Sequence, residues 1–421
     1  MKLIAIVAIK IKRGYLPQFI QSLYKHTSSI NMINLTYTDD KWEDYSVEII
    51  HSTRKDLARL IDFLKKNSEY FRDISITSTI EDKIKGGLLI SCGKEQVENL
   101  NDFQTSLIGG AILIHEKIEA GMKSNFCGIY NSVALISGHK VKKDSSENEI
   151  YHQYTESERD AIIINRFTGK NGFPLVIKYN SIEDMIKTIM TIESNFSCIR
   201  LMNQDEDDIL LNSIGDSITI PLISRDNDEF PLYYLSLIKK IARNNRLKLD
   251  QTSVGIIGLN RSSIRLTSLL NNSGFMKVLG YDSRERMMMS FENEKGLATT
   301  VQNILMNTDI VLIMDDTLKP EDIEYFRPGQ FIISYTVNDY LNRESLKVSG
   351  IKEFLKLAET DTAVLFPGMI NGLTQSGIKH FSDDMLIKMS DTILKIMDDS
   401  YTLPDIFSDI HEKITEIILR G

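Results

Sequence analysis

The stretch Ser253-Val-Gly-Ile-Ile-Gly-Leu-Asn-Arg-Ser-Ser-Ile-Arg265 decides the fold of the C-terminal half of the chain. An apolar run ends at Gly258 and leads directly into a helical pattern, and Asp282 follows the next apolar run. This order predicts the βαβ unit of a dinucleotide-binding domain. Of the three glycines in the fingerprint of such units, only Gly258 is present, and Asn260 and Ser263 take the other two positions. The sequence therefore predicts the doubly wound fold without an intact phosphate-binding turn.

A nucleotide at this turn would meet a short set of residues: Gly258, Asn260, Arg261, Ser262, Ser263 and Asp282. Asn260 places a side chain where a pyrophosphate should touch bare backbone. Against this, Arg261 and the serine hydroxyls stand at a helix N-terminus, which favours an anion. Asp282 would accept a hydrogen bond from a ribose 2′-hydroxyl and repel a 2′-phosphate. We expect dinucleotide binding to be weak or absent, and NAD to be preferred to NADP.

Composition excludes several classes of function. The chain has 421 residues, a net charge of −9 and 42% hydrophobic residues, which is ordinary for globular proteins and long enough for two or three domains. An acidic balance with spread lysines argues against nucleic acid and anionic membranes as partners. The three cysteines fit no metal or disulfide spacing, and the apolar residues 1–12 are too short to span a bilayer. We expect a cytoplasmic protein.

Residues 1–79 form a unit of their own. Their apolar periodicity predicts the order βαββαβ, with strands at 2–10, 30–37, 45–51 and 71–77 and helices at 17–25 and 53–66. This order is typical of a ferredoxin-like sandwich and resembles an ACT domain, a small-ligand sensor attached to many metabolic enzymes. The resemblance places Gly14, with Arg13 beside it, where backbone approaches an amino-acid ligand. We expect a small-molecule effector there; the other interpretation of Gly14 is a turn residue only.

Helices and strands then alternate to about residue 400, with one strand expected at 217–222, which predicts a layered α/β architecture. Four segments here resemble malic enzymes: Tyr130-Asn-Ser-Val-Ala-Leu-Ile-Ser, Gly172-Phe-Pro-Leu-Val-Ile, Ile220-Pro-Leu-Ile and Leu365-Phe-Pro-Gly-Met-Ile-Asn-Gly. The resemblance covers nearly the whole chain. It implies an ACT-like domain at 1–79, a substrate domain at 80–228, and a Rossmann-type domain at 229–421 whose C-terminal helices return to the substrate domain.

The resemblance also implies a reaction: oxidation of malate by NAD(P), then decarboxylation under a divalent metal. Such chemistry needs a base for the 2-hydroxyl proton and an acid for the enolate. By resemblance, Asp160 stands in place of the catalytic lysine and Ser106 in place of the catalytic tyrosine. Neither catalytic group of the family is therefore retained.

The metal positions of the family are substituted as well. Two adjacent carboxylates correspond here to Met202 and Asn203, and a thioether and an amide cannot replace them around Mg²⁺ or Mn²⁺. Asp226 matches the third ligand, but Arg225 stands beside it. Asn338 matches an asparagine that contacts substrate, while Thr362 replaces a second one by the same resemblance. We expect no divalent metal.

Displaced groups are the alternative source of catalytic residues. The acidic run 205–208 could supply metal ligands by an alignment slip, but four acids opening a helix are typical of a solvated first turn. Tyr151, Tyr154 or Lys170 could act as displaced acid or base, although nothing in their spacing selects them.

Together these substitutions predict a malic-enzyme-like pseudoenzyme that binds a ligand or regulates. The alternative is a diverged NAD-dependent oxidoreductase that uses displaced groups, and a third alternative is a structural partner of an active relative. We also expect a homodimer, because malic enzymes assemble in this way and ACT units pair through their sheets.

Overall fold

The computed structural model describes residues 3–26, 29–51, 54–79, 87–89, 100, 104, 108–141, 147–202, 214, 217–335, 350–357, 359–397 and 403–421. The chain divides into two compact units, Met1–Ser91 and Cys92–Gly421, and each is described by itself. Among the described residues, no helix has the length and apolar character needed to cross a membrane.

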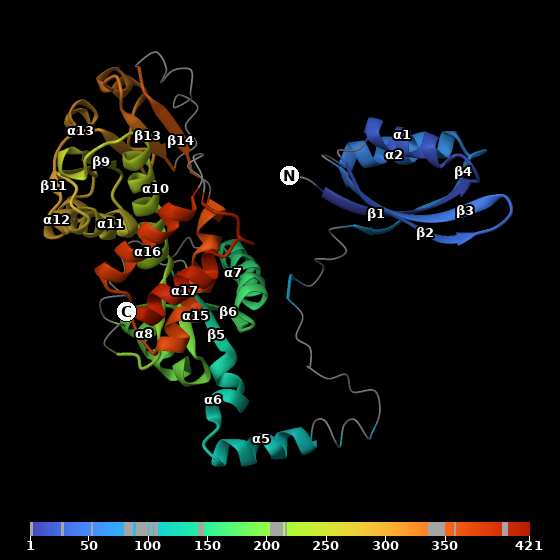
Figure 1. Ribbon diagram of the computed structural model, residues 1–421, viewed down its shortest axis with the longest axis horizontal. Coiled ribbons are helices and arrows are strands. Elements are labelled where there is room, and N and C mark those ends of the chain that lie inside the picture. Colours follow the sequence, from blue (N-terminus) through green and yellow to red (C-terminus); the bar gives the residue numbers. More distant parts are fainter. Residues whose placement is uncertain are drawn as a thin grey trace. The chain divides into compact units, whose positions relative to one another are not determined.

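The first unit takes the predicted order βαββαβ. Its elements are β1 (Leu3–Lys12), α1 (Leu16–His26), β2 (Ser29–Thr38), β3 (Trp42–His51), α2 (Arg54–Lys66) and β4 (Phe71–Thr79). The strands lie in the order β2-β3-β1-β4 and every neighbouring pair is antiparallel. Both helices cover one face of this sheet (Figure 1). Alternate residues of β1, namely Val7, Ile9 and Ile11, are buried under Phe19 and Leu60 of the helices, as the period of a strand requires.

The second unit contains two parallel sheets. The first has the order β6-β5-β7-β8, formed by β5 (Ser132–Lys140), β6 (Asn171–Tyr179), β7 (Cys198–Leu201) and β8 (Leu222–Ser224). Its helices are α5 (Gly110–Glu119), α6 (Lys123–Phe126), α7 (Glu147–Thr168) and α8 (Ile182–Ile192). Strand β8 begins only at Leu222, so the strand expected at 217–222 lies later in the chain than predicted.

The second sheet has six strands in the order β11-β10-β9-β12-β13-β14, all parallel. Their bounds are β9 (Ser253–Ile257), β10 (Lys277–Tyr281), β11 (Leu297–Ala298), β12 (Ile310–Ile313), β13 (Phe331–Ser334) and β14 (Glu353–Lys356). Numbered along the chain, this is the order 3-2-1-4-5-6 of doubly wound dinucleotide-binding domains. The fold predicted from the Gly258 stretch is confirmed.

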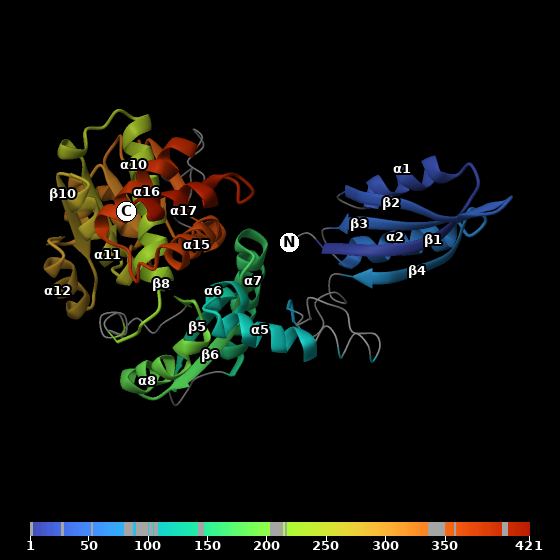
Figure 2. The same ribbon diagram turned by 60° about the horizontal axis from the view of Figure 1, so that its bottom comes forward.

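Helices complete this second part of the unit. They are α10 (Phe230–Asn244), α11 (Arg261–Asn272), α12 (Glu285–Asn293), α13 (Val301–Asn307), α15 (Phe366–Ser376), α16 (Asp383–Ile396) and α17 (Ile410–Arg420). Helix α10 runs beside α16 (Figure 2), and the buried Lys239 Nζ of α10 donates to Ser390 Oγ of α16 at 2.9 Å. Helix α15 also packs on α7, which joins the C-terminal helices to the first parallel sheet.

The Phe-Pro-Gly segment opens α15 and has a packing role. A Cβ on Gly368 would lie 2.6 Å from the carbonyl oxygen of His411, and one on Gly372 would collide with Ile418. The two glycines, four positions apart, share one face of α15 and let α17 approach closely. This part of the motif therefore survives for a reason that does not require catalysis.

Candidate functional site

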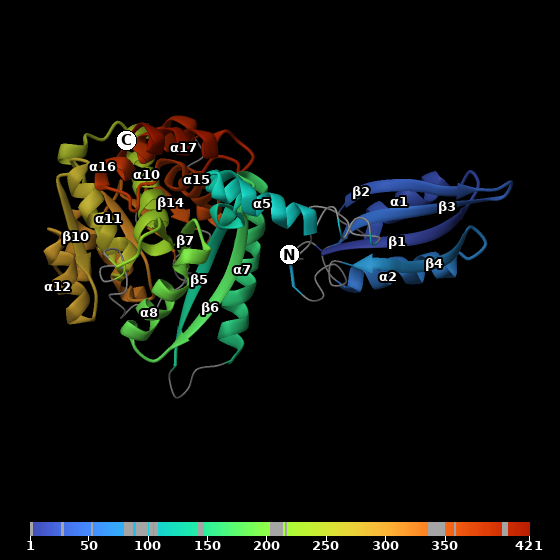
Figure 3. The same cartoon turned by 90° about the horizontal axis from the view of Figure 1, so that it is seen from below.

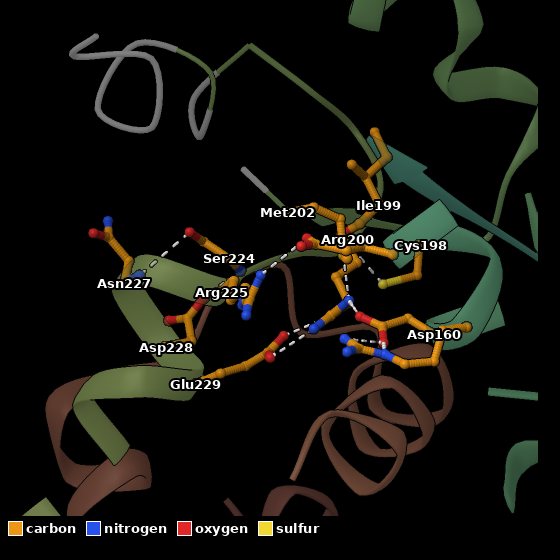
Figure 4. A network of polar contacts seen from close by, with 12 residues as sticks. Asp160, Cys198, Ile199, Arg200, Met202, Ser224, Arg225, Asn227, Asp228 and Glu229 are labelled. Carbon is orange, nitrogen blue, oxygen red and sulfur yellow. Dashed lines mark hydrogen bonds and ion pairs between the residues drawn. The ribbon is translucent and has the colours of Figure 1, made fainter. Parts of the chain in front are cut away.

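Three charged side chains from separate elements meet where β7 and β8 end. Arg200 lies in β7, Asp160 in α7 and Glu229 in the short π-helix Arg225–Glu229 that follows β8 (Figure 4). The carboxyl ends of parallel strands are the usual place of ligand sites in α/β folds. The set includes Asp160, the residue that the sequence analysis expects in place of the catalytic lysine of malic enzymes.

The three side chains form one buried ion network. Arg200 donates from Nε and Nη2 to the two oxygens of Glu229, at 2.6 and 2.8 Å, and from Nη1 to Asp160 Oδ2 at 2.7 Å. Each of the three is at most 1% exposed. The guanidinium also lies over the ring of Phe366, 3.9 Å from its centroid. Such a fork-shaped contact holds both carboxylates in fixed geometry.

Arg200 is held in its charged state. Burial acts to lower its pKa, but the two carboxylates outweigh burial and raise the pKa above its ordinary value. A guanidinium cannot accept a proton in this state and offers no lone pair to a metal. The ion network therefore contains a guanidinium that stays positively charged.

Asp160 is not available as a base in this arrangement. Its Oδ2 accepts from Arg200, and its Oδ1 accepts from Arg159 Nε at 2.8 Å. A general base must have a free position within hydrogen-bond distance of the proton that it takes. Both oxygens of Asp160 are engaged with cations, so a substrate hydroxyl would have to displace one of them.

Met202 and Asp226, the described residues at the expected metal positions, each lie beside an arginine. Met202 is buried with its sulfur in contact with Arg200 Nη1, so the thioether stands beside a cation. Asp226 is half-buried in the π-helix, next to Arg225, whose guanidinium lies 5.0 Å from the centroid of Phe230. Asn203 lies outside the described residues. Within those residues, no group of three or more His, Cys, Asp or Glu side chains is arranged to hold a metal.

Asp228 precedes Glu229 in the same π-helix and has an unusual protonation state. Its Oδ2 accepts from the backbone N–H of Ser224 at 2.7 Å, and burial of the carboxyl group raises its pKa to about 7. Desolvation is the main cause, since it penalises the charged carboxylate. The pKa of this carboxyl group is thus shifted toward neutral pH.

At the turn after β9, Gly258 keeps the backbone conformation of a dinucleotide-binding turn. The side chains of Asn260 and Ser263 bond the N–H groups that a phosphate would contact. Gly258 has φ +80°, and a Cβ there would collide with Asp315. Asn260 caps α11: its Oδ1 accepts from Ser263 N, and Ser263 Oγ accepts from Asn260 N, both at 2.9 Å. This capping box satisfies two of the N–H groups that a pyrophosphate would use. Ser262 and Ser263 are buried.

Asp282, the residue expected to bind the ribose, is likewise engaged. Its Oδ2 accepts from Leu259 N at 2.8 Å, and its Oδ1 accepts from Arg284 N at 2.8 Å and Nε at 2.9 Å. Burial acts to raise the pKa of Asp282, but the bonds from Arg284 and Leu259 outweigh it and lower the pKa. Arg284 Nη2 also donates to Leu259 O at 2.6 Å. Arg284 thus occupies positions on Asp282 that a ribose would need.

The residues expected to bind an effector lie in the first unit. Gly14 has φ +88° in the loop after β1, and Arg13 Nε lies 3.8 Å from Glu43 Oε1. The backbone conformation fits both interpretations of Gly14, as a turn residue and as part of a ligand site. The effector site stays a prediction.

Other predicted residues take no described part in the ion network. Tyr151 and Tyr154 are exposed on α7, and Thr362 is buried. Ser106, Asn338 and the acidic run 205–208 lie outside the described residues. Their expected correspondence to family positions therefore stays a prediction.

Lys170 lies toward the opposite end of the sheet that carries the network. It directly precedes β6, whose first residue pairs with Ser132 at the start of β5. Burial lowers the pKa of Lys170, and its Nζ donates to the carbonyl of Tyr130 at 3.3 Å. Arg200 pairs with Leu135, farther along β5 toward its carboxyl end. The register therefore separates Lys170 from the ion network.

Sequence patterns alone do not identify the members of the network other than Asp160. Arg200 stands inside the apolar run Cys198-Ile-Arg-Leu, and Glu229 precedes the apolar start of α10. A charged residue inside a buried strand needs a partner of opposite charge. That requirement is a signal for Arg200, but nothing in the sequence identifies its partners.

Comparison with known proteins places the fold among malic enzymes. The chain is 21% identical over 269 residues to NAD-dependent malic enzyme 1 of Bacillus subtilis, covering 62% of this chain and 61% of that relative. The chain thus spans less than two thirds of the length of this relative. It is 16% identical over 319 residues to the NAD-dependent malic enzyme of Geobacillus stearothermophilus, covering 69% and 67%. No protein-family model matches the chain.

Solved structures agree with the sequence relatives. The NAD-dependent malic enzyme of Thermotoga maritima superposes with a TM-score of 0.68 at 15% identity, covering 80% of this chain and 97% of that one. The malic enzyme of Pyrococcus horikoshii gives 0.67 at 15% identity, covering 79% and 86%. The predicted resemblance is confirmed at the level of fold, and the chemistry of this chain depends on its own residues.

Proposed function

We propose that this chain, a strongly diverged relative of the malic enzymes, does not decarboxylate malate and acts as a regulatory or ligand-binding protein. The observation that carries the proposal is the buried network of Asp160, Arg200 and Glu229. By the resemblance, Asp160 takes the place of the family's base and Met202, whose sulfur contacts Arg200, takes one of the metal positions. The network therefore keeps a guanidinium where the resemblance expects a base and a metal.

The energetics of the network favour its persistence. Removing one partner of a buried ion pair typically costs about 3–5 kcal/mol, because an unpaired charge remains behind. A substrate or metal that displaced Arg200 from Asp160 would have to offset a cost of that kind. A divalent cation would also be repelled by the guanidinium. These costs support the proposal that the described residues supply neither a base nor a metal site for the reaction of the family.

The nucleotide turn supports the same proposal. Asn260 and Ser263 satisfy each other at the start of α11, and Arg284 donates to Asp282. A dinucleotide would have to break these contacts before making its own. We therefore propose that NAD binds weakly or not at all.

The ligand in this proposal is an amino or carboxylic acid that binds the first unit, interpreted as an ACT domain, around Arg13 and Gly14. Gly14, with its positive φ, forms a tight turn in which the N–H groups of Arg13 and Tyr15 donate to backbone carbonyls. The side chain of Arg13 adds a positive charge that suits a carboxylate. The first unit would then sense a ligand, while the second unit keeps the fold of an enzyme without its reaction.

The second candidate is an NAD-dependent oxidoreductase that uses displaced groups. Two observations favour it: the strand order 3-2-1-4-5-6 is intact, and Gly258 keeps the φ of +80° that the tight turn requires.

Activity and binding assays separate the two candidates. Purified protein is given L-malate, NAD or NADP, and Mg²⁺ or Mn²⁺, and the absorbance of the reduced cofactor is followed. We expect no metal-dependent turnover. A rate of about 1 s⁻¹, modest for an enzyme, would refute the pseudoenzyme proposal. Without turnover, NAD binding in the low micromolar range that is lost in Asp282→Ala would favour the oxidoreductase, with some other substrate.

A further inference from the structure

Asp315 lies at the carboxyl end of the second sheet, beside the turn that follows β9. It comes two residues after β12, and β12 is a neighbour of β9 in the sheet. The last residues of the two strands, Ile257 and Ile313, are paired, and the N–H of Met314 donates to the carbonyl of Ile257 at 2.8 Å. This register brings Asp315 to the backbone of Gly258, the first residue after β9.

The two strands flank the switch point of the doubly wound sheet. They are the first and fourth strands in the order 3-2-1-4-5-6, and dinucleotides bind such sheets where the strand order reverses, outside the carboxyl ends. Helix α11 begins after the Gly258 turn and packs on β10 (Figure 3). A bound dinucleotide would therefore bring its pyrophosphate to the start of α11, next to Gly258.

The carboxyl group of Asp315 lies against this glycine. A Cβ on Gly258 would collide with Cγ and Oδ1 of Asp315 and would lie 2.7 Å from Oδ2. The carboxylate therefore fills the space that a side chain at Gly258 would need. Its Oδ1 also accepts from the N–H of Thr317 at 2.9 Å, which holds the side chain in this orientation. Because Asp315 is half-buried, its charge is only partly screened by solvent.

The charge of Asp315 opposes a pyrophosphate. The pyrophosphate of a dinucleotide is anionic, and like charges a few Å apart repel strongly where solvent is partly excluded. The other acid near this turn, Asp282, is offset by Arg284, whose Nε lies 2.9 Å from Oδ1 of Asp282. Among the described residues, no arginine or lysine forms a comparable ion pair with Asp315. Its negative charge is therefore directed at the switch point without compensation from that part of the chain.

We propose that Asp315 excludes dinucleotides from the switch point by placing a carboxylate against the backbone that a pyrophosphate would approach. This inference rests on the proposed function, in which NAD binds weakly or not at all, and it assigns that weakness to a residue outside the fingerprint of the turn. The cap formed by Asn260 and Ser263 engages N–H donors, whereas Asp315 adds repulsion. The two barriers are therefore separate, and the rejected class is any ligand with a pyrophosphate at this turn.

The test measures NAD binding by the full chain and two matched variants. Asp315→Asn keeps an oxygen that can accept from Thr317 and removes the charge, while Asp316→Asn removes the same charge from the exposed neighbour. Thermal shift and calorimetric titration are carried out with NAD up to the millimolar range. We expect Asp315→Asn to bind NAD at least about tenfold more tightly than the wild type, or about 1.4 kcal/mol. Asp316→Asn should bind like the wild type.

Two further variants make the outcome decisive. Asp315→Ser also removes the charge and should show the same gain, and circular dichroism without ligand checks that each variant is folded. In the background Asn260→Gly, which removes the cap of α11, Asp315→Asn should give a further gain of about tenfold, because the two barriers are separate.

The possible failures can be told apart. If neither Asp315 variant binds NAD more tightly in either background, this inference is overturned and the proposed function stands. Equal gains in Asp315→Asn and Asp316→Asn would also overturn it, because they would come from the net charge of the chain. Low-micromolar binding of NAD by the wild type would contradict the proposed function itself, and the exclusion with it.

Discussion

Replacing Arg200 with methionine should destabilise the second unit more than any exposed substitution. Methionine keeps much of the side-chain volume but leaves Asp160 and Glu229 buried without the cation that contacts both. Breaking a buried ion pair from one side costs about 3–5 kcal/mol. For a unit of this size that corresponds to a fall in Tm on the order of 10 °C.

The pH dependence of Arg200→Met tests the cause. In the variant, protonation of the two buried carboxylates removes their unpaired charge and so stabilises the folded state. The folded state therefore takes up more protons than the unfolded state as the pH falls. The difference in stability between the variant and the wild type should therefore be smaller at about pH 5 than at about pH 7. A loss caused only by poor packing would not depend on pH in this way.

The assay is thermal and urea unfolding at both pH values, followed by circular dichroism. Arg420→Met is the matched control, because Arg420 forms an exposed i,i+4 pair with Glu416 and its loss should leave Tm unchanged. The triple variant Arg200→Met, Asp160→Asn, Glu229→Gln removes the charges together and should recover most of the lost stability. A loss below about 1 kcal/mol in Arg200→Met would refute the view that the network is a strongly coupled buried unit.

Asp228, the cap of α11 and the loop at Gly14 each allow a direct test. Burial raises the pKa of Asp228 to about 7. The contribution of its bound proton to the free energy of unfolding is therefore lost as the pH rises from about 4 to 7. Asp228→Asn should flatten that part of a plot of unfolding free energy against pH. Asn260→Gly removes the cap of α11 and should cost about 1 kcal/mol or less while increasing the thermal shift given by millimolar NAD; an unchanged shift would mean that the cap does not limit binding. Gly14→Ala strains a residue at φ +88° and should abolish any calorimetric response to carboxylate effectors, whereas Gly169→Ala, at φ +70° in the second unit, should retain it.

The fold could be predicted from the sequence because it depends on local patterns. The apolar run that ends at Gly258, followed by helical periodicity and Asp282, specified a βαβ unit, and the observed strand order agrees. The alternation of buried residues in β1 likewise followed from a period of two. The predicted start of β8 was wrong. Its start depends on pairing with β7, and that pairing begins only at Leu222.

The sequence also predicts substitutions at the catalytic positions of the family, and this prediction rests on the resemblance. Asp160 and Met202 are chemically unlike the residues that the malic enzyme reaction needs, and this difference requires no coordinates. What these substitutions do instead required the tertiary structure. Arg200 and Asp160 are 40 positions apart, and Arg200 and Glu229 are 29 apart.

Periodicity specifies which face of an element is buried, but it does not specify which buried side chains face each other across elements. That pairing depends on how α7, β7 and the π-helix after β8 pack together, and each of them supplies one charge. A lone Arg200 in a buried strand would be unfavourable, and a lone Asp160 in a buried helix face would be as well. The two charges stabilise each other in the buried ion network only because the tertiary structure brings them into contact.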